Sequence, residues 1–245
     1  MIGDLFKPIR PLQILLSCLI PMCLILRLLS AMKIGMGVEL WPLAEAVLIL
    51  ITSIILGVAL SGDLNELSGK IQTLLLWASG CAFVSFLIWL TINPFVDLMS
   101  LSSMIKLHFF LLILSLASGS LGLMVGLFFD EPVYGAGAAL IIAALFISAV
   151  FWVNFLLGGS SGHSQLLIKF AIDSNPVIVV SSLLGGDPMH TKYLYEISEV
   201  SFYRFRYPRI HVIAIEYIGA FLILCSLATI KRLSAGRRQR RFLKS

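Results

Sequence analysis

Six long apolar runs constrain the fold of this 245-residue chain more than any other feature of its sequence. They cover about residues 11–32, 42–61, 71–92, 107–129, 135–157 and 211–230. Each run is close to the roughly 20 residues that a helix needs to cross a bilayer. Because backbone groups in lipid must be hydrogen-bonded within the protein, runs of this kind cross as α-helices. We therefore predict an all-α polytopic membrane protein with six transmembrane helices, in which residues 1–245 form a single integral membrane domain.

Composition supports this prediction and limits the partners of the chain. Hydrophobic residues make up 59% of the sequence and charged residues 13%, whereas a soluble domain carries about 25% charged residues. Seven of the eighteen Lys and Arg residues fall in the last fifteen positions. The net charge of +5 is therefore a property of the tail, typical of a membrane flank, and indicates no nucleic-acid partner.

Basic residues also predict the orientation of the chain. Lys7 and Arg10 precede the first run, and a basic tail, residues 231–245, follows the last. Cytoplasmic flanks of membrane proteins carry the excess of Lys and Arg, so we expect both termini in the cytoplasm. Residues 158–210 then form a long external segment between the fifth and sixth spans, which we name the external cap. Three tryptophans fall at external ends of their runs, where an aromatic belt is expected: Trp41, Trp89 and Trp152.

The external cap carries the signals of short helices. Asn175 is a favourable N-cap residue, and Pro176 suits the first helical position. We expect a short helix to begin there and to end near Gly185. Aromatic residues of the cap that we expect at the headgroup interface include Tyr195 and Tyr207. This cap either seals the bundle or contacts a substrate.

Polar side chains within the apolar runs are candidates for a substrate path. Five of them fall in the outer part of their runs: Arg27, Glu45, His108, Asn154 and Glu216. Because a charge inside hydrocarbon costs several kcal/mol, five such groups at one level predict a shared polar vestibule beneath the external cap. The alternative is that Glu45, His108 and Asn154, each within a turn of a helix end, reach interfacial water.

Small residues recur at four-residue spacing in the fourth and fifth runs. They are Ser118, Gly122 and Gly126, followed by Gly135, Ala139 and Ala143. Helices in lipid associate through faces of this kind, because small residues let two backbones approach. We therefore predict close packing of these spans.

Known catalytic and metal-binding patterns are missing from the sequence. It contains no H-E-x-x-H, G-x-S-x-G or Rossmann pattern, and Gly69-Lys70 fails the Walker pattern on both sides. The four cysteines lie within apolar runs and form no C-x-x-C pair. We therefore predict a protein that is not an enzyme, with no catalytic residues, no metal site and no cofactor. Any ATP hydrolysis would belong to a partner chain.

With this layout the chain resembles the membrane permease subunits of ABC-2-type transporters of the bacterial exporter kind. The resemblance rests on the six-span layout, the cytoplasmic termini and the external segment with a Pro-initiated apolar element at Asn175-Pro176. It implies a homodimer or heterodimer of permeases in a bacterial inner membrane, which recruits a cytoplasmic ATP-binding subunit and exports a substrate. Positions that correspond to the ATPase-facing loop of the family are Asp63, Glu66 and Lys70.

Two functions of other classes stay open. One is a non-transporting membrane subunit or scaffold, whose basic tail docks anionic lipid or a cytoplasmic partner. The other is an intramembrane enzyme that uses Glu216 and His108. The sequence indicates no particular substrate for any of these functions.

Overall fold

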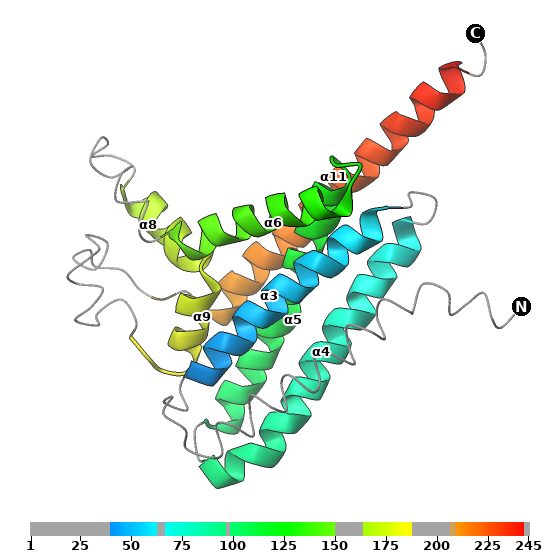
Figure 1. Ribbon diagram of the computed structural model, residues 1–245. Helices are drawn as coiled ribbons and strands as arrows, with labels where there is room; N and C mark the ends of the chain where they lie inside the picture. Colours follow the sequence, from blue (N-terminus) through cyan, green and yellow to red (C-terminus); the bar gives the residue numbers. More distant parts are fainter. Residues whose placement is uncertain are drawn as a thin grey trace, which may run out of the picture.

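The computed structural model describes residues 40–62, 67–96, 99–149, 164–187, 207 and 209–242. Within these residues the chain forms seven α-helices (Figure 1). In chain order they are α3 (Leu40–Ser61), α4 (Leu67–Val96), α5 (Leu101–Gly126), α6 (Pro132–Ile147), α8 (Ser164–Asp173), α9 (Pro176–Leu183) and α11 (Ile210–Phe242).

Four of these helices, α3, α4, α5 and α11, are long and apolar enough to cross a bilayer. They correspond to the second, third, fourth and sixth predicted spans. Large apolar side chains such as Leu76, Ile141 and Ile215 are exposed along the bundle, and in a membrane lipid covers such a surface. The described part of the chain is therefore an all-helical integral membrane protein.

The fifth predicted span is only partly a described helix. Helix α6 ends at Ile147, so its 16 residues are fewer than the roughly 20 that a full crossing needs. Ser148 closes it, because its backbone N–H donates to the carbonyl of Ala144 at 2.9 Å. Residues 150–157 and the first predicted span, residues 11–32, lie outside the described residues, so six spans stay a prediction.

The fourth span begins earlier than predicted. Helix α5 starts at Leu101 because Ser100 caps it, with its hydroxyl oxygen accepting from the backbone N–H of Ser103 at 3.2 Å. It ends at Gly126, and a short turn leads to Pro132 at the start of α6. Lys106 and His108 therefore lie in the first two turns of this helix.

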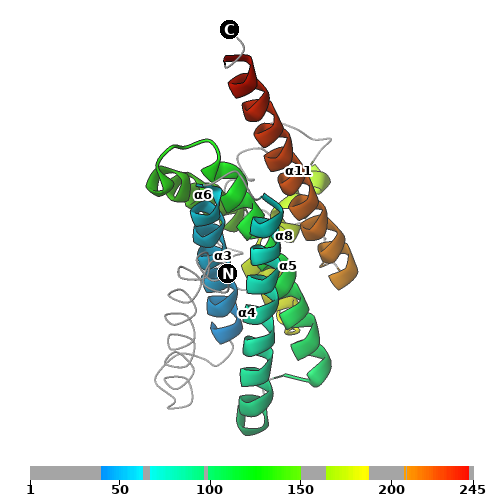
Figure 2. The same cartoon turned by 90° about the vertical axis from the view of Figure 1, so that its right-hand side faces the viewer.

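The ends of the described helices gather at two opposite ends of the bundle (Figures 1 and 2). The ends of α3 and α6 that flank residues 62–67 and 127–131 lie toward the C-terminal half of α11, whereas the α8–α9 pair lies at the other end, to the left in Figure 1. Lys231 of α11 places its Nζ 3.1 Å from the ring centroid of Phe128 in the α5–α6 turn. This alternation is what the predicted topology requires, and the membrane side of each end stays a prediction.

Close backbone contact between α3 and α5 forms the centre of the bundle. A Cβ added to Gly57 would lie 2.0 Å from the carbonyl oxygen of Gly119, and one added to Gly122 would lie 2.2 Å from that of Ile54. Gly135 of α6 continues this face, since its added Cβ would lie 3.2 Å from Cα of Gly126. The predicted close packing is confirmed, and its buried members are Ser118, Gly122, Gly126, Gly135, Ala139 and Ala143.

Helix α9 packs into the bundle instead of lying over it. Its residues Val179 and Val180 are fully buried in the main core, which also contains residues of α3 and α5. The side-chain oxygen of Asn175 accepts from the backbone N–H groups of Val177 and Ile178 at 3.0 and 3.3 Å. Gly185, just beyond the end of the helix, has φ +83°. The predicted capped helix at Asn175-Pro176 is confirmed.

Candidate functional site

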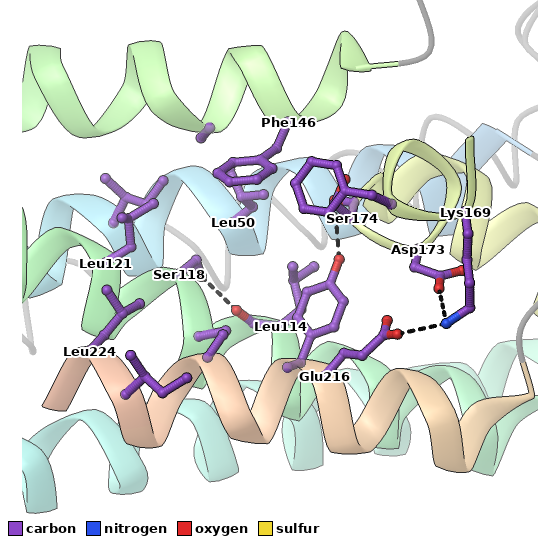
Figure 3. Close-up of a pocket in the computed structure, with 17 residues that line it drawn as sticks. Leu50, Leu114, Ser118, Leu121, Phe146, Lys169, Asp173, Ser174, Glu216 and Leu224 are labelled. Atoms are coloured by element: carbon purple, nitrogen blue, oxygen red, sulfur yellow. Dashed lines mark hydrogen bonds and ion pairs between the residues drawn. The ribbon is translucent and has the colours of Figure 1, made fainter. Parts of the chain in front are cut away.

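A cavity of about 680 Å³ lies between α3, α5, α6, α8 and α11 (Figure 3). Its volume falls within the range of about 300–1,000 Å³ that is usual for small-molecule sites. The body of the cavity is apolar, and its walls include Leu50, Ile54, Leu114, Leu121, Phe146 and Leu224. Charged side chains from α8 and α11 lie together at one end, which we name the mouth.

Three charged residues form the mouth: Lys169 and Asp173 from α8 and Glu216 from α11. The Nζ atom of Lys169 lies 3.2 Å from Oδ2 of Asp173 and 3.2 Å from Oε1 of Glu216. Asp173 is almost enclosed, with 6% of its side chain exposed, whereas Lys169 is 56% exposed. Two carboxylates thus share one ammonium group at the end of an apolar cavity.

The enclosure of Asp173 affects its ionisation. Burial is the larger cause, and repulsion from Glu216 the second, that raises the pKa of Asp173 from 3.8 to about 6. Lys169 acts in the opposite direction and lowers this pKa. Hydrogen bonds to Glu216 and Asp173 raise the pKa of Lys169. Lys169 therefore stays charged at neutral pH, while Asp173 gains a proton when the pH falls slightly below neutral. The charge of the mouth depends on pH for this reason.

Two hydrogen bonds position α8 relative to α6 and α11. Asn175, which caps α9, also donates from Nδ2 to the carbonyl of Ile147 at the end of α6, at 2.6 Å. The hydroxyl of Tyr217 donates to the carbonyl of Ser174 at 3.2 Å, and its ring packs edge-on against Phe110 of α5. The α8–α9 corner is thus attached to α6 and α11, and Asp173 is held beside Glu216.

A second polar group lies between α3, α4 and α5, and we name it the Glu45 cluster. Ser85 donates to one carboxylate oxygen of Glu45, and Trp89 Nε1 donates to the other at 2.8 Å. Ser85 Oγ also lies 2.9 Å from Nε2 of His108, whose Nδ1 lies 2.7 Å from the carbonyl of Met104. All four side chains are buried, so Glu45 and His108 meet inside the protein and do not reach interfacial water.

One hydroxyl group holds the Glu45 cluster together. The carbonyl of Met104 can only accept, so Nδ1 of His108 donates to it. On the other side of the imidazole ring, Oγ of Ser85 contacts both Nε2 of His108 and the carboxyl group of Glu45. Ser85 therefore links α3, α4 and α5.

The order of groups in this cluster differs from that of a catalytic triad. In a triad the histidine stands between the serine and the carboxylate, whereas here Ser85 stands between Glu45 and His108. None of these three residues lines the cavity. The geometry supports a structural link between helices better than a nucleophilic site.

Helix α5 separates the two polar groups, and this corrects the prediction of one shared vestibule. His108 packs edge-on against Phe86 of α4, whereas Phe110 packs against Tyr217 of α11. Residues two apart lie on nearly opposite sides of an α-helix, because one turn takes about 3.6 residues. Glu45 and His108 therefore lie on one side of α5, and Glu216 joins the mouth on the other side.

The structure places some of the other predicted site residues and leaves others out. Lys70 lies in the first turn of α4 and is partly exposed. Tyr207 donates to Asp187, which follows α9, a contact within the external cap. Five predicted residues lie outside the described ranges: Arg27, Asp63, Glu66, Asn154 and Tyr195.

Sequence reasoning missed four residues of the two groups: Ser85, Trp89, Lys169 and Asp173. Trp89, which the sequence places at the external end of its run, is buried within the bundle, and its N–H bonds to Glu45. Ser85 gives no signal, since serine is common in apolar spans. Lys169 and Asp173 do carry one, because opposite charges four residues apart face each other on a helix.

No protein family, curated protein or solved structure matches this sequence.

Proposed function

We propose that this chain is the membrane permease subunit of an ABC-2-like exporter and that its substrate occupies the cavity. The observation that carries the proposal is the α8–α9 pair, which lies between α6 and α11 in the chain and packs into the bundle at the end of the cavity. This is the position and the Pro-initiated element on which the resemblance to ABC-2 permeases rests. The external segment is therefore part of the substrate site.

The lining of the cavity supports a transport function. Its walls come from three of the four helices that are long enough to span, α3, α5 and α11, and its mouth from the external segment and α11. A substrate in this position would contact both the spans and the external cap. Movement of α8 relative to α11 would separate Lys169 from Glu216 and change access to the cavity.

The proposed working unit is a homodimer or heterodimer of permeases in a bacterial inner membrane, with both termini in the cytoplasm. A separate ATP-binding subunit supplies the energy and contacts Asp63, Glu66 and Lys70. The fold supports this contact, because the last residues of α3 and the first of α4 lie at the same end of the bundle as the C-terminal half of α11 (Figure 1).

Purification of the tagged chain from its native membrane in mild detergent, followed by mass spectrometry, tests the proposal. We expect a dimer with a stoichiometric ATPase subunit. Joint replacement of the three loop residues, Asp63→Asn, Glu66→Gln and Lys70→Met, should remove the ATPase. Asp187→Asn, which changes the external cap at the opposite end, should retain it. A monomer that binds no ATPase in any detergent would contradict the proposal.

One observation favours a second candidate, a scaffold whose basic tail binds a cytoplasmic partner or anionic lipid. Helix α11 continues without a break to Phe242, beyond its apolar span, which ends at Lys231. The basic tail therefore begins as a helical extension of a span. Under this candidate, deletion of residues 233–245 releases the partner and the triple loop variant has no effect. The permease proposal expects the reverse.

A further inference from the structure

The cavity suits a ligand with a hydrocarbon body and one small polar head. Its walls are leucine, isoleucine, alanine and phenylalanine side chains over most of their length, and charged groups lie together at the mouth (Figure 3). A fully polar ligand would leave its polar groups unpaired against these walls, which costs binding free energy. A purely apolar ligand would make no use of the charged groups at the mouth.

The charges at the mouth determine the sign of that head. Asp173 and Glu216 bring two negative charges and Lys169 one positive charge, so the mouth carries an excess of one negative charge when all three are ionised. An anionic head would add a third negative charge beside two carboxylates. A cationic head would neutralise the excess, and charge complementarity of this kind selects one ligand over another.

Lys169 already shows how an ammonium group fits the mouth. Its Nζ lies within hydrogen-bonding distance of both carboxylates, at 3.2 Å from each. The lysine side chain is more than half exposed, whereas Asp173 is enclosed. A lysine on a flexible stem can turn toward solvent, while the carboxylate of Asp173 has to stay in place.

We propose that the mouth binds the ammonium head of a cationic amphiphile, and that Lys169 occupies this position in the ligand-free protein. The hydrocarbon chain of the ligand lies along the apolar walls, between Leu114 of α5, Phe146 of α6 and Leu224 of α11. When the ligand binds, its ammonium group replaces that of Lys169 between the two carboxylates. This inference rests on the proposed function for its meaning, since it names the class of substrate, but its test needs no transport.

Competition by Lys169 makes the mutations act in opposite directions. Lys169→Met removes the internal competitor and leaves both carboxylates, so binding of a cationic amphiphile should tighten by about fivefold, as for a partly exposed ion pair. Asp173→Asn and Glu216→Gln each remove one partner of the ammonium group and should weaken binding by about tenfold or more. A cavity that merely collects hydrocarbon would show neither change.

Photolabelling of the purified full chain in phosphatidylcholine nanodiscs tests the inference. The probes are dodecylamine and dodecanoic acid, each with a photoreactive diazirine on its hydrocarbon chain, and mass spectrometry locates the labelled residues. We expect saturable labelling of α5, α6 and α11 by the amine at neutral pH, and none by the acid. Lys169→Met should lower the half-saturating amine concentration, and the two carboxylate variants should raise it.

Matched controls separate the mouth from the rest of the surface. Lys106→Met and Glu131→Gln change exposed charges elsewhere in the bundle and should leave the half-saturating concentration unchanged. Addition of phosphatidylethanolamine to the nanodiscs shows whether a membrane lipid supplies the ammonium head, because it would then compete with the amine. Without such competition the ligand is a soluble amphiphile, and the ammonium site stands in both cases.

Two results would overturn the inference. One is saturable labelling of the same residues by the acid probe, which would show that the head charge is irrelevant. The other is an unchanged or weaker affinity of Lys169→Met for the amine. This variant keeps both carboxylates, and we predict that its affinity increases. Either result leaves the permease proposal to its own test, the ATPase co-purification.

Discussion

Gly122→Ala tests the central claim about the fold, that backbone contact between α3 and α5 holds the bundle together. The new Cβ would lie 2.2 Å from the carbonyl oxygen of Ile54, whereas carbon–oxygen contacts are ordinarily about 3.3–3.6 Å. The clash is with backbone, so no side chain can rotate away to relieve it. The two helices would have to separate by roughly 1 Å, a gap that forfeits a quarter to a half of the dispersion energy of each contact across it.

This geometry sets the size of the effect. Overpacking of a close contact costs about 1–3 kcal/mol, and we expect the upper part of this range, because the interface runs the length of two helices. Gly80→Ala is the matched control, since α4 offers open space around that position. There the substitution should stabilise by about 0.5–1 kcal/mol through helix propensity alone. Both variants gain this helix propensity, so the difference between their free energies of unfolding measures the packing cost alone. We expect this difference to be about 2–3 kcal/mol.

Equilibrium unfolding of the purified chain in mixed micelles, followed by far-UV circular dichroism as the fraction of denaturing detergent rises, measures this difference. Gly122→Ala should unfold at a lower detergent fraction than the unmodified chain, and Gly80→Ala at the same or a higher fraction. Equal stability of the two variants would refute the argument, because it would show that α3 and α5 do not approach as closely as the structure describes.

Three further predictions follow from individual contacts. Ser85→Ala leaves the buried carboxylate and imidazole of the Glu45 cluster without their shared hydroxyl and should lower the free energy of unfolding by about 1–3 kcal/mol, whereas Ser226→Ala on the exposed side of α11 should have little effect in the same assay. Asn175→Ala removes the N-cap of α9, worth about 1 kcal/mol, and should speed hydrogen exchange at the first amides of that helix, measured by mass spectrometry. Folding raises the pKa of Asp173 from 3.8 to about 6, so the folded protein binds this proton more tightly than the unfolded chain. The free energy of unfolding should therefore fall as the pH rises from about 4 to 6, and Asp173→Asn should flatten this slope. An unchanged slope in the variant would show that the carboxyl group is not enclosed as described.

Hydrophobicity and local sequence signals were sufficient to predict where most of the described helices lie in the chain. The runs at 42–61, 71–92 and 211–230 match α3, α4 and α11 closely, because a bilayer-length apolar segment has no other regular structure in lipid. The capped helix at Asn175-Pro176 and the small-residue faces were also predictable, since each depends on the chemistry of residues close together in sequence. A helix begins away from its predicted boundary where a capping residue fixes its start, as Ser100 does for α5.

The polar groups were less predictable because their formation depends on the rotation of each helix about its axis. Helices α3, α4 and α5 are apolar around most of their surface, so the sequence does not show that Glu45, Ser85 and His108 face a common point. A difference of two positions, from His108 to Phe110, moves a side chain to the other side of α5. Depth in the membrane can be estimated from sequence, but the face of the helix requires the packing of the neighbours.

The distribution of charge at the mouth also explains why it holds a cation of its own. Two carboxylates beside an apolar cavity are costly unless a cation pairs with them, so the ligand-free protein needs an internal one. Lys169 supplies it from the exposed side of α8, with 56% of its side chain exposed, while Tyr217 and Asn175 hold the adjoining corner. This arrangement lets the cation leave while the carboxylates stay, which is what exchange for a ligand ammonium group requires.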